Sequence, residues 1–364
     1  MNEPDAPDAA LEALLSVQRT LPNVTAGLAP IEGTLKDRPE DFVVEEVPAY
    51  DPSGTGEHLY LWIEKRGLNT QDALARIART LGANVASAGY AGLKDRNAVT
   101  RQWLSFHHTA TPAPDALAVE GVRVLEVARH GNKLRTGHLH GNRFTIRLAG
   151  VPREHDAHAE ATLARLEARG LPNYYGDQRF GRGGDNLRRA AAWVVGRGRA
   201  PDKPFLRKLY VSTLQAALFN AWVGERLDDG LDEAALRGDV LRKEETGGLF
   251  TCEAPELDTP RVRSWEISPT GPMFGAKMRA AEADALARES ALLARYGVTL
   301  DDFARVARFG EGTRRPARVR PRGVETVRDG DDLVLSFTLP KGSYATVLIA
   351  ELTKTRDVTL GDDP

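Results

Sequence analysis

A single carboxylate between two cations is the pattern in this sequence that most suggests chemistry. Asp95 lies between Lys94 and Arg96, shortly after Gly92. Cationic neighbours favour the ionised form of a carboxylate and lower its pKa. An ionised carboxylate can act as a nucleophile or as a base at neutral pH. The same pattern is also typical of an exposed turn whose aspartate caps backbone N–H groups, and spacing alone leaves both interpretations open.

Positive charge is concentrated in two stretches, although the formal net charge of the chain is -2. In residues 179–208, only Asp185 and Asp202 oppose a long series of arginines and lysines, and residues 305–328 are similarly rich in arginine. Such stretches are typical of surfaces that bind phosphate groups, and also of solvated helix faces and loops. The candidates for contact with a nucleic-acid backbone in the first stretch are Arg179, Arg182, Arg188 and Arg189.

Length and composition limit the class of protein. A chain of 364 residues favours two domains over one. The one cysteine, Cys252, excludes an internal disulfide and suits a reducing compartment. No apolar run is long enough to span a membrane, and the acidic first ten residues lack the features of a signal peptide. We therefore expect a cytoplasmic protein with no membrane partner.

The hydrophobic pattern predicts the elements that must position Asp95. Alternating apolar residues predict strands over 42–47, 58–64, 102–106, 122–127, 143–148 and 332–339. Helical spacing predicts helices over 70–81, 156–169, 211–222 and 283–294, one more beginning at Asp185, and a last one from Ser343 to Lys354. Asn69 and Gly82 mark the start and the end of the first of these helices. Because strands and helices do not alternate regularly, the pattern predicts an α+β fold.

The order of these elements suggests how the domains are arranged. A strand-rich beginning and a strand-rich end flank a middle region that is rich in arginine and mostly helical. We therefore expect one domain that is interrupted by a second, inserted one. Residues 1–30 precede the first predicted strand and are expected to form a poorly ordered extension.

Seven short motifs together resemble those of the TruD-type transfer RNA pseudouridine synthases. They occur in order between residues 34 and 352, and their residues are 39–46, 56–59, 67–70, 91–102, 141–144, 172–181 and 342–346. The resemblance implies a catalytic domain built from a mixed or antiparallel sheet flanked by helices. It also implies that this domain, residues 31–168 plus 318–364, is interrupted by a mostly helical TRUD domain at residues 169–317.

The resemblance further implies an isomerase that converts uridine in transfer RNA to pseudouridine, at position 13 in bacterial members. The reaction moves ribose C1′ from N1 to C5 of the same uracil, so it is expected to need no cofactor and no metal. The expected partner is tRNA, with no obligatory protein partner and a monomeric chain. Two alternatives stay open: an RNA-binding or RNA-folding protein without isomerase activity, and a carboxylate-based hydrolase of small molecules.

The resemblance also assigns roles to individual residues. Asp95 matches the catalytic aspartate of the family, and Lys36 matches a basic residue beside it that would keep the carboxylate ionised. The carboxylate would attack ribose C1′, remove a ribose proton or stabilise positive charge on the sugar, and the sequence does not choose among these.

Four further residues match positions that surround the uracil in the family. Phe42 matches an aromatic of the active site, and Asn142 and Phe144 match the motif Gly-Asn-x-Phe. Tyr344 stands where bacterial members often carry phenylalanine. Aromatic rings would hold the detached base by stacking while it turns, and the amide would recognise a uracil or ribose edge. Without the resemblance, Phe42 and Phe144 would be assigned to packing within their strands.

Overall fold

The computed structural model describes residues 6–35 and 38–356. The chain forms two compact units. Unit 1 contains residues 1–29, 164–320 and 346–357, and unit 2 contains residues 30–163, 321–345 and 358–364. The limits predicted for the insertion, 169 and 317, stay a prediction; residues 346–357, predicted as part of the catalytic domain, are grouped with unit 1. No helix in the described part of the chain is both long enough and apolar enough to cross a membrane.

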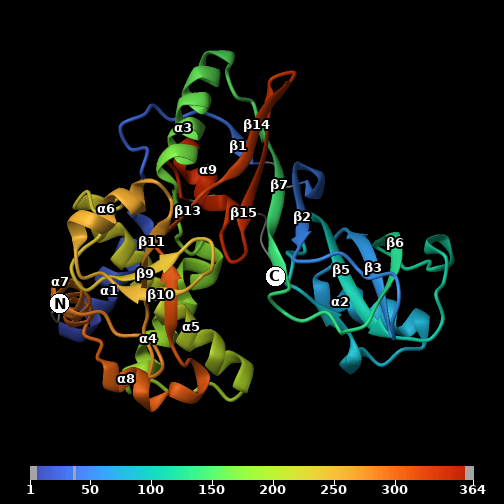
Figure 1. Cartoon of the computed structure of the whole chain (residues 1–364), viewed down its shortest axis with the longest axis horizontal. Helices are drawn as coiled ribbons and strands as arrows, with labels where there is room; N and C mark the ends of the chain where they lie inside the picture. The colour runs from blue at the N-terminus through green and yellow to red at the C-terminus, as the bar shows by residue number, and fades with distance from the viewer. Residues whose placement is uncertain (1–5, 36–37, 357–364) are drawn as a thin grey trace, which may run out of the picture. The chain divides into compact units, whose positions relative to one another are not determined.

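Unit 2 is built around one large mixed sheet (Figure 1). In its described residues the strand order is β14-β15-β7-β2-β5-β3-β6, with β1 beside β7 and β4 beside β5. Along this order, β2 and β5 are parallel and the other neighbours are antiparallel. The strands are β1 (Thr34–Leu35), β2 (Phe42–Pro48), β3 (His58–Lys65), β4 (Gly89–Tyr90), β5 (Val99–His107), β6 (Val122–His130), β7 (Leu139–Ala149), β14 (Arg322–Asp329) and β15 (Asp332–Pro340). The α+β class predicted from the sequence is confirmed.

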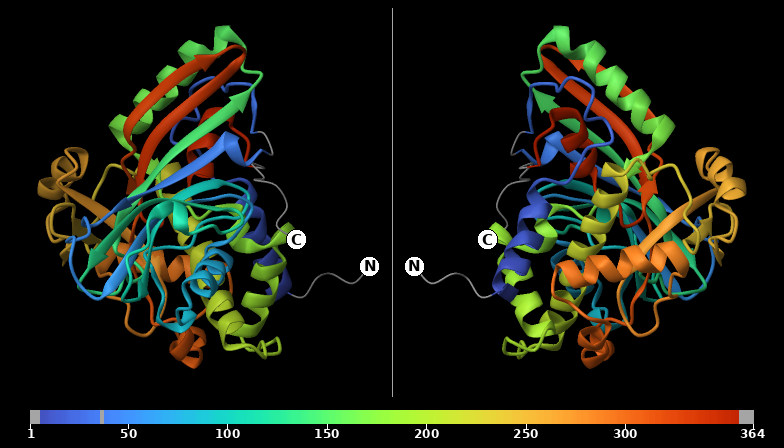
Figure 2. Two further views of the ribbon diagram at one scale, coloured as in Figure 1. Left: turned by 90° about the vertical axis from the view of Figure 1, so that its right-hand side faces the viewer. Right: turned by 90° about the vertical axis from the view of Figure 1, so that its left-hand side faces the viewer.

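Helix α2 (Thr70–Leu81) has the bounds that the sequence predicts. The side chain of Asn69 accepts a hydrogen bond from the backbone of Asp72 (2.8 Å), and Gly82 ends the helix with φ of 63°. Its buried face, centred on Ile77, packs against apolar residues of β3 and β5. Helix α3 (Asp156–Arg169) begins in unit 2, where Asp156 forms an ion pair with Arg328 of β14. In the sheet of this unit, the C-terminal strands β14 and β15 lie beside β7 (Figure 2).

Unit 1 combines helices with a small sheet. Its helices are α1 (Ala6–Arg19), α4 (Asp185–Val194), α5 (Pro204–Asp228), α6 (Pro255–Arg263), α7 (Ala283–Arg295), α8 (Leu300–Arg305) and most of α9 (Ala345–Thr353). Its strands are β8 (Leu171–Pro172), β9 (Val240–Lys243), β10 (Leu249–Thr251), β11 (Ile267–Met273), β12 (Thr313–Pro316) and β13 (Arg318–Val319). In its described residues, one antiparallel sheet has the order β10-β9-β11-β12, and β13 pairs with β8. Most of α5 between Tyr210 and Gly224 is buried, so this helix forms the core of the unit.

The small sheet of unit 1 was not expected from the sequence, which predicts a mostly helical region. Every residue of β11 is buried, but the strand contains Pro269, Pro272 and Gly271, residues that argue against a central strand. A Cβ at Gly271 would lie 2.6 Å from the ring of Trp222, so glycine lets the strand approach α5 closely. The side-chain packing that makes this strand possible is therefore not visible as a local pattern.

The N-terminal segment also differs from the expectation. Helix α1 occupies residues that were predicted to be a poorly ordered extension, and Leu14 and Leu15 are almost completely buried. Gln18 accepts a 3.0 Å hydrogen bond from the side chain of Asn220 in α5. The apolar residues of α1 are covered by partners about 200 positions away in the sequence, which explains why they gave no signal of packing.

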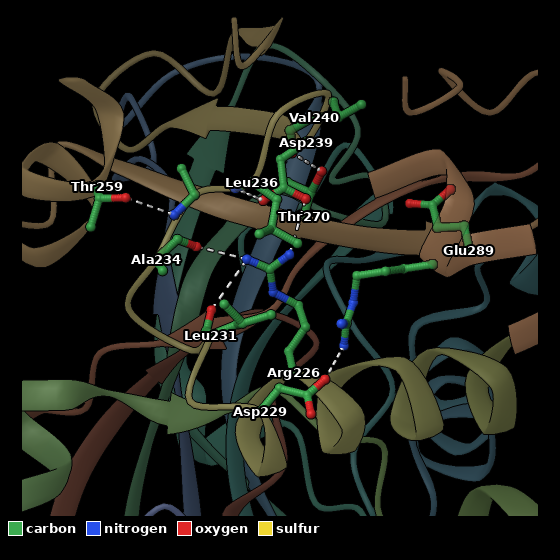
Figure 3. Close-up of polar contacts among 12 residues, drawn as sticks. Arg226, Asp229, Leu231, Ala234, Leu236, Asp239, Val240, Thr259, Thr270 and Glu289 are labelled. Atoms are coloured by element: carbon green, nitrogen blue, oxygen red, sulfur yellow. Dashed lines mark hydrogen bonds and ion pairs between the residues drawn. The ribbon is translucent and has the colours of Figure 1, made fainter. Parts of the chain in front are cut away.

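A buried ion pair connects α5 to the segment that follows it in unit 1 (Figure 3). Arg226 of α5 bonds to the carboxylate of Asp239 at 3.0 Å, and both side chains are almost completely buried. The same guanidinium donates to the carbonyls of Leu231 (3.2 Å) and Ala234 (2.7 Å), so one buried charge fixes the turn after α5. The pairing with Asp239 offsets part of the free-energy cost of burying the cation.

Candidate active site

The loop that carries Asp95 lies where two neighbouring strands diverge. Strand β5 pairs with β2 from Val99 to Arg101, and from Leu104 onward β4 takes the place of β2. Residues 91–98 connect β4 to β5 at this point, and Asp95 is exposed in the middle of the loop. The loop of Asp95 therefore lies at the point where β4 takes over from β2 along one side of β5.

Lys94 neutralises a buried carboxylate instead of remaining at the surface. Its Nζ lies 3.0 Å from Oε2 of Glu46 in β2, and both side chains are nearly inaccessible. Oε1 of Glu46 also accepts a hydrogen bond from the backbone of Trp103 at 3.3 Å. Burial raises the pKa of Glu46, whereas the charge of Lys94 opposes this rise. The pair ties the loop to β2 and β5.

A second buried cation lies directly beneath Asp95, and sequence reasoning missed it. Lys65, the last residue of β3, is completely buried. Its Nζ donates hydrogen bonds to the backbone carbonyls of Leu68 (2.6 Å) and Asp95 (2.7 Å). Burial lowers the pKa of Lys65 to about 8, although the negative charge of Asp95 acts in the opposite direction. A lysine at the end of a strand gives no local sign of burial, since most lysines in that position are solvated.

Hydrogen bonds join the loop to the preceding motif at residues 67–70. The donor and acceptor pairs are Lys94 N–H to Thr70 Oγ1 (2.9 Å), Thr70 Oγ1 to Gln102 Oε1 (3.0 Å), Gln102 Nε2 to the carbonyl of Gly92 (3.1 Å), and Arg96 Nε to the carbonyl of Gly67 (3.1 Å). The two motifs that the sequence presents separately therefore form one connected structure. This network fixes the backbone on both sides of Asp95.

Phe42 and Phe144 lie in neighbouring strands on one face of the large sheet. Their ring centroids are 6.2 Å apart in an edge-to-face arrangement, and Phe144 also stacks on Phe337 of β15 at 5.5 Å. Both rings are largely buried, with exposed fractions of 3% for Phe42 and 6% for Phe144. These rings therefore belong mainly to the hydrophobic core, and only a small part of each can contact a ligand.

Asn142 lies on the same face of the sheet as Glu46, the residue that pairs with Lys94 of the Asp95 loop. It pairs with Glu46 of β2 on one side and with Leu339 of β15 on the other. Its Oδ1 is buried and has no hydrogen-bond partner within the described residues. Unsatisfied buried acceptors are costly, so this oxygen is a candidate for contact with a ligand. The register thus brings Asn142 next to the glutamate that holds Lys94.

Tyr344 follows the strand that borders Asn142. Strand β15 ends at Pro340, which pairs with Gly141, and the partly buried Tyr344 comes four residues later. Lys36 lies outside the described residues, so its predicted position beside Asp95 is an expectation only. Among the candidate residues described in unit 2, Phe42 contacts Phe144. Asn142 lies beside Glu46, which pairs with Lys94 of the Asp95 loop.

The four arginines proposed for RNA contact belong to unit 1, and two of them are engaged within the protein. Arg179 donates to Oγ of Ser212 at 2.7 Å. Arg188 pairs with Glu12 of α1 (3.2 Å) and donates to the carbonyl of Gly183 (2.9 Å). Arg182 and Arg189 are exposed.

The fold described above matches that of a solved structure. A crystal structure of a Methanosarcina mazei protein described as "Putative tRNA pseudouridine synthase D (TruD)" matches it with a TM-score of 0.73, at 22% sequence identity. The match covers 91% of this chain and 95% of the other.

Sequence comparison defines the family. The profile of the family "tRNA pseudouridine synthase D (TruD)" matches residues 22–197 and 202–352. A tRNA pseudouridine synthase D from Anaeromyxobacter sp. (strain Fw109-5) is 54% identical over 92% of this chain and 96% of the relative. A protein of that name from Thermus thermophilus is 45% identical over 92% of both chains. The chain belongs to the TruD family, which confirms the resemblance of its motifs.

Proposed function

We propose that this protein is an isomerase that converts uridine to pseudouridine in tRNA, at position 13, with Asp95 as its catalytic residue. One observation carries the proposal. Asp95 is exposed, but the buried Lys65 donates a hydrogen bond to its backbone carbonyl, and hydrogen bonds of Lys94 and Arg96 hold the residues on either side of it. A loop backbone held in one geometry limits the positions open to the carboxylate, so less ordering is required when the substrate binds.

The chemistry needs no leaving group and no change of oxidation state. The bond between ribose C1′ and uracil N1 breaks, the uracil turns, and a bond from C1′ to C5 forms. The proton on C5 is lost, and N1 gains one, so atoms balance. Asp95 acts at the sugar, as nucleophile, base or electrostatic stabiliser. Each role requires the ionised carboxylate.

The uracil must remain bound while it is detached from the sugar. The edge-to-face pair of Phe42 and Phe144 is proposed to border the base with the small area that it leaves exposed, and the buried Oδ1 of Asn142 is proposed as an acceptor for an imide N–H of the base. Tyr344 is proposed as a further aromatic contact, and Lys36 as a second cation near Asp95. Because the target uridine lies in folded RNA, it must be turned out of the stack before it reaches Asp95.

The proposed assignment divides the work between the two units. Unit 2 would carry out the reaction, and the basic surface of unit 1 would bind the tRNA backbone. We further propose that the chain works in the cytoplasm as a monomer without a cofactor. Analytical ultracentrifugation with and without tRNA would test the oligomeric state.

A comparison of three proteins tests the function. Wild type, Asp95→Asn and Asp115→Asn are incubated with an unmodified tRNA transcript, and pseudouridine is mapped along the RNA. Asp115 is an exposed carboxylate of unit 2 outside the Asp95 loop, so its variant is a matched control. We expect modification at position 13 by wild type and Asp115→Asn, and none by Asp95→Asn. Binding of tRNA by wild type without any pseudouridine would instead favour an RNA-binding protein that lacks isomerase activity.

A further inference from the structure

The two arginine-rich stretches of the sequence meet at one hollow of unit 1. One side is formed by the end of α4 and the start of α5, including Trp193 and Arg207. The other side is formed by Arg305, Arg308 and Phe309, at the end of α8 and in the short 3-10 helix Ala307–Phe309. The hollow has a volume of about 490 Å³. Residues more than 100 positions apart are thus brought to one open site.

Two aromatic rings and two guanidinium groups lie close together at this hollow. The ring centroids of Trp193 and Phe309 are 5.8 Å apart and tilted by 56°. The guanidinium carbon of Arg308 lies 4.6 Å from the centroid of Phe309, and that of Arg207 lies 5.6 Å from it. Arg308 is exposed, whereas Trp193 and Phe309 are half-buried. Aromatic rings offer stacking surfaces for bases, and arginines bind phosphate.

Backbone carbonyl groups orient two of the arginines at this site, and one of these arginines also pairs with an aspartate. Nε of Arg207 donates to the carbonyl of Pro201 at 2.6 Å, which leaves its positive charge uncompensated at that contact. Arg305 donates to the carbonyl of Val194 (2.8 Å) and pairs with Asp302 (2.7 Å). A ligand in the hollow would therefore meet oriented guanidinium groups with net positive charge.

A second hollow in unit 1 also pairs an aromatic ring, Phe250, with arginines, but the charges of its lining differ. It has a volume of about 590 Å³, and its lining mixes acidic residues such as Glu253 and Glu282 with Arg261 and Arg279. Arg261 pairs there with Asp258 at 2.7 Å. Mixed charges of this kind repel a phosphate as much as they attract it, so this second hollow does not suit RNA.

We propose that the hollow between Trp193 and Phe309 binds one nucleotide of the tRNA, with the base against the aromatic rings and its phosphate against Arg207 and Arg308. This assignment rests on the proposed function, because it takes tRNA as the substrate. It moves the RNA contact from the start of α4, where Arg188 is paired with Glu12, to the end of that helix. Arg182 and Arg189, which are exposed near the start of α4, are proposed to make weaker contacts with tRNA phosphates than Arg207 and Arg308 do.

Binding of an unmodified tRNA transcript tests the assignment with one surface variant, one aromatic variant and one control. Phe309→Ala is expected to raise Kd at least about five-fold through loss of stacking. Arg308→Gln changes an exposed residue, so the fold is expected to be retained. It is expected to raise Kd and to reduce the slope of log Kd against log salt concentration by about 1, the value for one lost phosphate contact. Arg263→Gln removes an exposed charge of α6 that does not line the hollow, and should leave the salt dependence unchanged.

A fluorescence titration identifies the kind of ligand. Quenching by tRNA that is present in wild type and reduced in Trp193→Phe is expected, whereas uridine monophosphate at the same concentration should have little effect. Quenching by the mononucleotide as strong as that by tRNA would assign the hollow to a small ligand and overturn the proposal.

The outcomes separate this assignment from the function itself. If wild type forms pseudouridine but Arg308→Gln and Phe309→Ala bind tRNA with unchanged Kd and salt dependence, only the assignment of the hollow is wrong. If wild type neither binds nor modifies tRNA, the proposed function fails and the assignment fails with it.

Discussion

The ammonium group of Lys65 lies beneath the loop of Asp95 and donates a 2.7 Å hydrogen bond to the backbone carbonyl of that residue. A second hydrogen bond, to the carbonyl of Leu68, ties it to the neighbouring motif. The buried cation therefore acts on Asp95 in two ways, by fixing its backbone and by supplying a positive charge. We regard Lys65 as a positioning residue for the proposed reaction.

Replacement of Lys65 should lower the rate constant without preventing tRNA binding. Lys65→Met removes both hydrogen bonds and the charge, and a small displacement of the carboxylate can cost about 100-fold in rate. Single-turnover kinetics over a range of tRNA concentrations separate the rate constant from the affinity. An unchanged rate constant in Lys65→Met would show that the contact does not position Asp95.

The pH dependence of the rate provides an independent test of Lys65. Its pKa is lowered to about 8 by burial, so the rate of wild type should fall as pH rises through about 8 and the charge is lost. The charges that act on this group are those of Asp95 and Lys94. Lys65→Arg stays charged at these pH values and should extend activity to higher pH. A fall at the same pH in Lys65→Arg would assign the titration to another group.

Stability should change with pH in the direction opposite to activity. The pKa of Lys65 is lower in the folded chain than its ordinary value of 10.5, so the unfolded chain binds more protons between pH 8 and 10.5. The contribution of Lys65 to the free energy of unfolding should therefore rise over this range. Denaturant unfolding of wild type and Lys65→Met at several pH values measures the difference, which should be absent if Lys65 titrates normally.

The ion pair of Lys94 and Glu46 should be required for stability of unit 2. Lys94→Met leaves a buried carboxylate without its cation, which typically costs about 3–5 kcal/mol in the free energy of unfolding. Lys94→Met combined with Glu46→Gln removes both charges and should recover part of this loss. Urea unfolding measures both variants. Equal losses in the single and double variants would show that the charge of Glu46 is not the cause.

Asn142 is expected to serve the substrate more than the fold. Its Oδ1 has no hydrogen-bond partner within the described residues, so Asn142→Ala should change the free energy of unfolding little through this atom. Loss of one hydrogen bond to uracil should lower kcat/KM about ten-fold, or by about 1.4 kcal/mol. Unfolding measurements and steady-state kinetics on the same preparation separate the two effects. A large loss of stability with unchanged kinetics would contradict this role.

Helix α1 should stabilise unit 1. Leu14 is almost completely buried, and truncation of such a side chain to alanine typically costs about 2–5 kcal/mol. Ser16 is exposed on the same helix, so Ser16→Ala is the matched control and should be nearly neutral. Thermal and urea unfolding compare the two variants. Similar behaviour of Leu14→Ala and wild type would show that α1 contributes little.

Local patterns were sufficient for many elements of the fold. The cap at Asn69 and the glycine at position 82 define α2 because both act within a few residues of the helix ends. Alternation predicted strands such as β7 and β15, whose partners only the folded chain could show. In contrast, β11 was missed because its prolines and glycine lack strand propensity, and only contact with α5 makes that sequence suitable.

For the site, the sequence by itself determined the family and predicted the loop of Asp95 as the catalytic one, because the short motifs that carry this information can be read in order along the chain. Only the tertiary structure decided that Lys94 is committed to Glu46 and that Lys65 lies beneath Asp95. It also decided that Trp193 and Phe309 share one hollow. The physical reason is that periodicity and capping depend on neighbours in sequence, whereas the burial of a charge or the meeting of two rings depends on residues that fold together from distant positions.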